Sequence, residues 1–185
     1  MKNEFIDKSN IVFIAKSLDS YISDRNGKLD WLQKIPNHEN NDMGYSDFIG
    51  NIDAIIMGRT TFETVCSFDI DWPYKIPVFV LSNTLKTIPE KFKDKAEFIN
   101  GSPAKIVTEL NQKGYNRLYI DGGKTIQSFL KEDLIDELII TTIPVLLGGG
   151  SSLFSDLPNE LNFKHIKTQL FLNEIVQSHY KRKHN

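Results

Sequence analysis

The chain has 185 residues, of which 40% are hydrophobic and 25% are charged. This is the composition of an ordinary globular protein, and it excludes an intrinsically disordered chain, which would combine few apolar residues with a high net charge. The 22 basic and 24 acidic side chains give a formal net charge of −2, which argues against a strongly basic nucleic-acid-binding protein. The length predicts a single domain over residues 1–185.

Cysteine and histidine offer little for metal or redox chemistry. Cys66 is the one cysteine, so neither an internal disulfide nor a cysteine-rich zinc site is expected. The four histidines show no metal-ligand spacing, and no metal site is predicted. The apolar run Ile11–Ala15 is too short for a signal sequence or a membrane span. We therefore expect a cytoplasmic protein with no membrane partner.

In the first half of the chain, buried strands alternate with polar segments. Apolar runs predict two strands, and apolar periodicity predicts a helix between them. A long polar stretch follows the first strand and reads as a functional loop. The spacing of Thr60 and Glu63 is that of a capping box, which predicts a helix start. The predicted segments are a strand at Ile11–Ala15, a loop at 17–41, a helix at 40–49 and a strand at Ile52–Met57.

The second half continues this alternation and then changes. Four further strands are expected at Pro77–Leu81, Ala96–Ile99, Arg117–Ile120 and Glu137–Ile143. Helices are expected from the Ser102-Pro103 cap to Gly114 and over Lys124–Lys131. The last two runs, Asn162–Leu172 and Glu174–Lys181, read as a hairpin with a tight connection at Asn173. The pattern predicts an α/β fold with a mostly parallel sheet, helices on both faces and an antiparallel ending.

Ligands of such sheets bind at the carboxyl ends of the strands. Two strand-to-helix junctions there carry glycine, Met57-Gly58-Arg59-Thr60-Thr61 and Asp121-Gly122-Gly123-Lys124-Thr125. Glycine admits close approach to the backbone, and a helix N-terminus favours phosphate. The pair suits the pyrophosphate of a dinucleotide, although glycine at such a turn also has a purely geometric explanation. Neither junction is a standard Rossmann or P-loop motif.

Three other features allow two interpretations each. Asp42, near the start of a helix, is either an acid favoured by the helix dipole or a proton donor in a cleft; residue chemistry alone favours the first. Trp31 either covers a ligand or anchors its loop by burial. The Gly148-Gly149-Gly150 run after Pro144 is interpreted as a flexible bend rather than a ligand loop.

Several segments, taken in order, resemble the dihydrofolate reductase superfamily. Its first strand is similar to Ile11–Asp19, and its MGRxTxE signature matches Met57–Glu63. The turn at Leu118–Gly123 resembles its later Gly-Gly turn. The segment from Leu134 to Phe154, with its three glycines, is most similar to the bacterial riboflavin-biosynthesis reductase domain, the C-terminal half of a bifunctional deaminase–reductase. The N-terminal deaminase domain of that enzyme has no counterpart here.

The resemblance implies a three-layer fold with about eight strands and an antiparallel C-terminal hairpin, and NADPH as the hydride donor. It implies a cis peptide between Gly122 and Gly123, and a mobile lid at residues 17–31. The implied cofactor-binding residues are Ala15, Gly58, Arg59, Thr60, Thr61, Leu81, Ser82, Gly122, Gly123, Lys124 and Thr125.

On the substrate side, the family acid lies sixteen positions before the signature glycine, which implies a catalytic role for Asp42. Thr141 matches the family threonine that supports this acid, and Trp31 is the second implied substrate-binding residue. The family arginine for the folate tail is missing, because Ile76-Pro77 stands there. This departure weakens folate as the substrate.

Two further departures from the family pattern stand at Asn83 and Ser20. Asn83 follows Ser82, where many relatives carry an arginine for the 2′-phosphate, which makes the preference for NADPH over NADH less secure. Ser20 replaces a usual glycine after Ser-Leu-Asp.

The predicted function is therefore an NADPH-dependent reductase of the riboflavin-pathway type, acting on 5-amino-6-(5-phosphoribosylamino)uracil or a related pyrimidine or pterin. The alternatives are reduction of dihydrofolate, and a nucleotide-binding protein that has lost turnover. The expected partner is a small-molecule substrate, with no nucleic acid. The resemblance is compatible with a homodimer.

Overall fold

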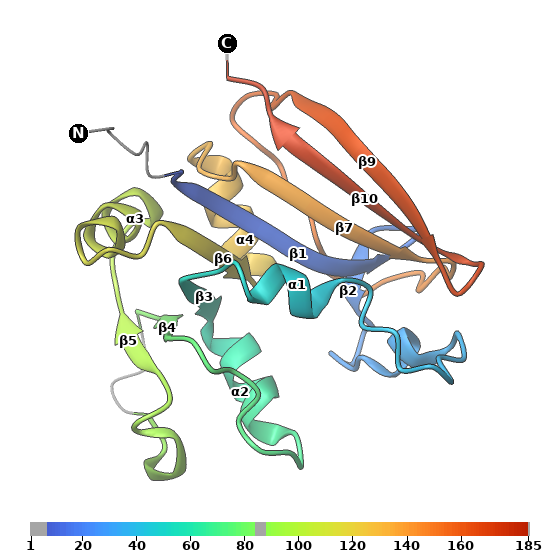
Figure 1. Cartoon of the computed structure of the whole chain (residues 1–185), viewed down its shortest axis with the longest axis horizontal. Coiled ribbons are helices and arrows are strands. Elements are labelled where there is room, and N and C mark those ends of the chain that lie inside the picture. The colour runs from blue at the N-terminus through green and yellow to red at the C-terminus, as the bar shows by residue number, and fades with distance from the viewer. Residues whose placement is uncertain (1–6, 84–87, 185) are drawn as a thin grey trace.

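The computed structural model describes residues 7–83 and 88–184. Its main sheet has eight strands in the order β5-β4-β3-β6-β1-β7-β10-β9 (Figure 1). The strands from β5 to β7 are parallel, and β10 and β9 are antiparallel. The bounds are β1 Ser9–Ser17, β3 Ala54–Gly58, β4 Val78–Leu81, β5 Glu97–Ile99, β6 Arg117–Asp121, β7 Glu137–Ile143, β9 Phe163–Phe171 and β10 Ile175–Arg182. The predicted α/β architecture with its terminal hairpin is confirmed.

Helices cover both faces of this sheet, which makes three layers (Figure 1). Helices α1 (Tyr45–Ile49) and α2 (Arg59–Ser67) pack on one face, and α3 (Pro103–Gln112) and α4 (Gly123–Lys131) on the other. No helix in the described ranges is long and apolar enough to cross a membrane.

The inner strands are buried on both sides because their sequences are continuous apolar runs. In β3, residues Ala54 to Met57 are all fully buried. Their side chains alternate between two cores, so Ile56 packs with α3 and α4 while Ile55 and Met57 pack with α2. Local sequence also determines where α3 begins. The Ser102 hydroxyl accepts a hydrogen bond from the Lys105 N–H (3.4 Å), and Pro103 is the first residue of the helix.

Two predicted helix starts were wrong. Helix α1 begins only at Tyr45, because Asn40, Met43 and Gly44 all have positive φ and break the predicted helix over 40–49. Helix α2 begins at Arg59, one residue before the predicted cap, because Gly58 serves as its N-cap. The expected capping box does not form.

The long polar loop contains structure of its own. Strand β2 (Tyr21–Ser23) pairs with β8 (Ser151–Ser152) in a second, two-stranded sheet, and a 3-10 turn, η1, spans Asp30–Gln33. Before β2 the backbone turns at Ser20, whose φ of +65° explains why glycine suits this position.

A carboxylate ties this loop to the glycine-rich segment. Asp19 accepts hydrogen bonds from the Ser17 hydroxyl (2.6 Å) and from the backbone N–H groups of Leu147 (3.1 Å) and Gly148 (2.7 Å). The bond from Ser17 is the main reason that the pKa of Asp19 falls to about 2. The glycine run is therefore packed against the loop, and the interpretation as a simple bend was incomplete.

Gly150 lies at the tightest point of this contact. A Cβ there would overlap the Ser23 carbonyl oxygen, and its φ of +140° disfavours any side chain. We expect Gly150→Ala to lower the free energy of unfolding by about 3 kcal/mol, from overpacking and backbone strain together. Urea denaturation measures this. The matched control is Gly27→Ala, at φ +75° with open space around it, for which strain alone gives a loss of about 1 kcal/mol. Equal losses for the two variants would contradict the packing argument.

Candidate functional site

The two glycine junctions meet at one edge of the sheet. Strands β3 and β6 are parallel neighbours, so their carboxyl ends lie side by side. A Cβ on Gly58 would lie 2.8 Å from the Thr125 hydroxyl, and a Cβ on Gly122 would overlap the Thr61 hydroxyl. Each glycine therefore packs against a threonine of the other junction. The N-termini of α2 and α4 converge at this point.

These N-termini have the properties of a diphosphate site. The N-cap residues of α2 and α4 are the glycines Gly58 and Gly122, which have no side chain to cap the helix, and both helix dipoles place partial positive charge at the junction. Lys124 is exposed in the first turn of α4 and adds a full charge.

The turn at Gly122 differs from the expected geometry. The described residues contain no cis peptide, so the implied cis bond between Gly122 and Gly123 is not present. A φ of +89° at Gly122, which only glycine adopts readily, turns the chain instead. The Gly122 N–H donates a 2.8 Å hydrogen bond to the Asp121 carboxylate, which fixes the turn.

The other predicted cofactor residues flank the junctions. Leu81 is in register with Gly58, and the Ser82 N–H donates to the Ile99 carbonyl oxygen at the same sheet edge. Arg59 Nε donates to Glu63 at 2.7 Å. Ala15 pairs with Thr141 between β1 and β7.

Asp42 lies in the position of a helix-capping acid. It is exposed, and its carboxylate accepts hydrogen bonds from the N–H groups of Gly44 and Ser46, both at 2.9 Å. The bonds from Ser46 and Gly44 lower the pKa of Asp42. A carboxyl group in this state is ionised near neutral pH and is a poor proton donor. The geometry therefore favours the capping interpretation of Asp42.

Thr141 supports the chain beside Asp42 rather than Asp42 itself. Gln177 Nε2 donates to Thr141 Oγ1 and to the Met43 carbonyl oxygen, both at 3.0 Å. Thr141 and Gln177 are buried, so this amide holds the segment before α1 against β7 and β10. Nothing in the sequence singles out Gln177, which is one polar residue in an alternating strand.

Trp31 anchors its loop by burial, which is one of its two predicted interpretations, and its role as a cover for a ligand stays a prediction. Its side chain is only 4% exposed and packs with Ile143 and Ile175, with Ala15 and Met43 nearby, so it anchors the loop. Its indole N–H is buried and has no hydrogen-bond partner among the described residues. A buried donor of this kind is destabilising unless a ligand or water pairs with it.

The residue that sequence reasoning missed is Asp121, the last residue of β6. It is partly buried, and burial raises its pKa to about 6. Burial also raises the pKa of Tyr45, Tyr74 and Tyr119, and the negative charge of nearby Asp121 raises each further. The available signal was an acidic residue ending an apolar strand directly before the glycine turn.

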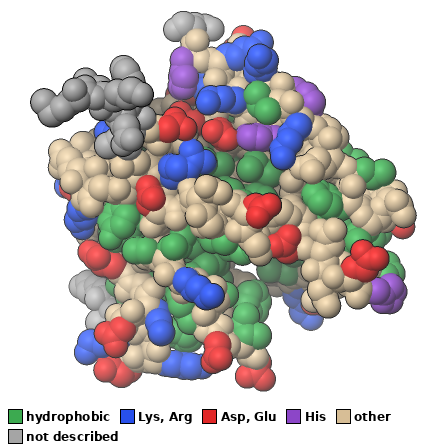
Figure 2. All heavy atoms as spheres, viewed as in Figure 1, with side chains coloured by type: hydrophobic (Ala, Val, Ile, Leu, Met, Phe, Trp, Pro, Cys, Tyr) green, Lys and Arg blue, Asp and Glu red, His purple; other side chains and the backbone are tan. Residues whose placement is uncertain are grey.

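Aromatic rings surround this carboxylate. Phe13 stacks on Phe48 at 4.7 Å, while Tyr45 and Tyr119 make edge contacts of 5.7 Å to Phe13 and 5.0 Å to Phe48, respectively. Together with Tyr74 these residues form what we call the aromatic group. The space-filling view shows this face of the molecule hollowed between the part that carries α2 and the part that carries β2 (Figure 2). Flat rings beside a carboxyl group are suited to a planar substrate.

The strand order, the two converging glycine-led helices and the antiparallel hairpin define a dihydrofolate-reductase-like fold. In agreement, dihydrofolate reductase from Enterococcus faecalis, solved with NADP(H), superposes with a TM-score of 0.66 at 16% identity, covering 95% of this chain and 97% of that one. At this identity the likeness shows the fold alone.

Sequence comparison gives the family. The profile described as the RibD C-terminal domain matches residues 9–177. A protein of Shewanella sp. PV-4, named as a candidate riboflavin biosynthesis protein, is 52% identical with a TM-score of 0.93, over 95% of this chain and 99% of that one. The uncharacterized protein YwjB of Bacillus subtilis is 36% identical over 96% of this chain and 99% of its own length. The chain belongs to the RibD C-terminal domain family of reductases.

Asp121 and Asp42 are expected to change the free energy of unfolding with pH in opposite directions. Burial raises the pKa of Asp121 from 3.8 to about 6, so its contribution to stability falls as the pH rises through this window. Asp121→Asn should therefore exceed wild type in free energy of unfolding at pH 8, by at most about 3 kcal/mol, and match it below pH 4. Urea denaturation across pH gives both values.

Asp42→Asn is the matched control for this measurement. Hydrogen bonds lower the pKa of Asp42, so its stabilising contribution is present at neutral pH and is lost as the pH falls. The variant should be less stable than wild type at pH 8. A loss of stability in Asp121→Asn at pH 8 would show that burial of the charged Asp121 carboxylate does not destabilise the fold.

Proposed function

We propose that this protein is an NADPH-dependent reductase that delivers hydride to a pyrimidine-type substrate of the riboflavin-pathway kind. The observation that carries the proposal is that two helix N-termini without side-chain caps converge at Gly58 and Gly122, next to the partly buried carboxyl group of Asp121. Family membership supports the reductase class, and the solved relative with NADP(H) supports the cofactor.

The residues at the junctions fit the cofactor. Because Gly58 and Gly122 carry no side chain, Thr125 and Thr61 pack against them and the two helix N-termini start close together, where Lys124 adds a positive charge for a diphosphate. When bound there, the nicotinamide supplies a hydride. The adenosine end is assigned to Leu81 and Ser82 on the neighbouring strand, with Arg59 and Thr60 at the start of α2, and the nicotinamide end to Ala15 and Gly123.

We assign the proton to Asp121. A carboxyl group with a pKa of about 6 is partly protonated near neutral pH, and it can donate a proton to the substrate nitrogen or oxygen that gains an electron pair when hydride adds to the neighbouring carbon. The aromatic group orients a planar ring, and the buried N–H of Trp31 is a donor available to a substrate oxygen or a bridging water. Asp42 has neither the burial nor the pKa for this role.

The segment before β4 favours a pyrimidine over dihydrofolate. Ile76 packs in the core beneath α2, and no arginine stands there to bind a folate carboxylate. Dihydrofolate reduction is the second candidate, because the fold is that of dihydrofolate reductase and Thr141 lies on the matching strand. Association as a homodimer and a cytoplasmic location stay predictions.

The cofactor assignment predicts the effect of one lysine. Lys124→Ala should weaken NADPH binding about tenfold, because it removes a charge-assisted contact to phosphate. Thermal shift and calorimetry with NADPH and NADH measure this. Lys131→Ala, in the last turn of the same helix, is the matched control and should bind like wild type. Absence of a shift with both nucleotides would favour a protein that has lost its cofactor.

The proton assignment is tested by turnover. Asp121→Asn should lower substrate-dependent NADPH oxidation about 100-fold or more, because the amide cannot donate an equivalent proton, while the NADPH thermal shift persists. Asp42→Asn should stay within a few-fold of wild type. The substrates for the screen are the ribosylaminouracil phosphate and dihydrofolate. The reverse ranking of the two variants would restore Asp42 as the acid.

A further inference from the structure

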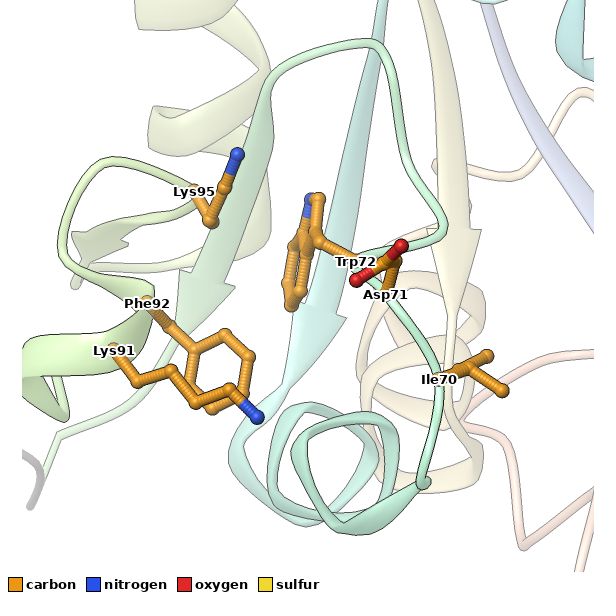
Figure 3. A pocket seen from close by; sticks show the side chains of 6 residues that line it. All are labelled: Ile70, Asp71, Trp72, Lys91, Phe92 and Lys95. Carbon is orange, nitrogen blue, oxygen red and sulfur yellow. The ribbon is translucent and has the colours of Figure 1, made fainter.

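A second cavity lies away from the glycine junctions, between the chain that follows α2 and the chain around the 3-10 turn η2 (Glu90–Phe92). Its volume is about 290 Å³, near the lower end of the sizes typical of small-molecule sites. Figure 3 shows its lining side chains, which are Ile70, Asp71, Trp72, Lys91, Phe92 and Lys95.

Two aromatic rings form its walls. The rings of Trp72 and Phe92 lie 5.7 Å apart and are tilted by 46°. Both make edge contacts with Phe62 of α2, at 6.1 Å and 6.3 Å. Phe62 is 1% exposed, so the core holds both walls in place. A planar ring placed against them would bury aromatic surface with little loss of side-chain entropy.

A lysine ammonium lies at each end of these rings, Lys95 toward Trp72 and Lys91 beside Phe92 (Figure 3). Lys91 and Lys95 both come from the η2 side of the cavity (Figure 3). The Lys91 ammonium lies 5.3 Å from the centre of the Phe92 ring, and within the described part of the chain neither lysine makes an ion pair. Lys93, between them, is paired with Glu90 at 3.5 Å. Asp71 is the only acid in the lining, so the two lysines leave an excess of one positive charge.

We propose that this cavity is a second ligand site, which takes a planar aromatic ring bearing one anionic group, a carboxylate or a phosphate. The ring lies against Trp72 and Phe92, and the anionic group meets the Lys91 ammonium beside the Phe92 ring. The site is distinct from the proposed active site. Trp72 belongs to this cavity, whereas Tyr74, two residues later, belongs to the aromatic group beside Asp121.

Tryptophan fluorescence of the full chain tests the proposal, because Trp31 and Trp72 are the two tryptophans. The probes are benzoate and adenosine 5′-monophosphate, which distinguish a carboxylate from a phosphate source. Inorganic phosphate and adenosine serve as anion-only and ring-only controls. We expect saturable quenching by at least one probe, weaker binding of both controls, and loss of the signal in Trp72→Phe.

Charge variants locate the anion. Lys91→Ala should weaken binding about two- to fivefold, as expected for an exposed charge pair, and Lys95→Ala should change it less than about twofold. Lys93→Ala is the matched control and should bind like wild type. No saturable quenching, quenching that persists in Trp72→Phe, or equal effects of all three lysines would each overturn the proposal.

Calorimetry separates this proposal from the proposed function. Binding of the successful probe should be unchanged by saturating NADPH and in Asp121→Asn. Displacement by NADPH would mean that the probe occupies the cofactor site and would overturn a second site. If NADPH fails to bind while the probe still binds, the result counts against the proposed reductase function and leaves the second ligand site supported.

Discussion

The contact between the two glycine junctions governs the rest of the site. Gly58 and Gly122 end neighbouring parallel strands, and the Thr125 and Thr61 side chains fill the space where each would carry a Cβ. Because both positions are glycine, α2 and α4 begin directly at the strand ends and their N-termini converge. Any larger residue would separate the helices, and the partial charges of their first turns would no longer act on one ligand.

The same constraint sets the state of Asp121. The turn at Gly122 brings its N–H onto the preceding carboxylate and holds that carboxylate beside Tyr119 and the rings around it. Burial there raises its pKa, whereas Asp42, with two backbone donors in an exposed position, has a lowered pKa. Asp121 and Asp42 have the same side-chain chemistry, and their environments shift the two pKa values in opposite directions.

Local sequence predicted the features that depend on local rules. Continuous apolar runs identified the strands, alternation identified the terminal hairpin, and glycine before a helix identified both junctions. The features it missed are contacts between distant residues. Asp19 binds Leu147 and Gly148 across about 130 positions, and Gln177 reaches Met43 across 134. No short window contains such a pair, and the start of α1 depended on positive φ at Asn40 and Met43, which propensity does not reveal.

The segment between α2 and β4 contributes to both proposed sites. Trp72 and Tyr74 make an edge contact at 5.4 Å; one ring forms a wall of the cavity at η2, and the other lies near Asp121. The two rings pack directly against each other, and each fills space that the other would otherwise leave empty. In this protein the chain that precedes β4 carries no arginine for a folate tail, and its aromatic residues join the proposed active site to the second cavity.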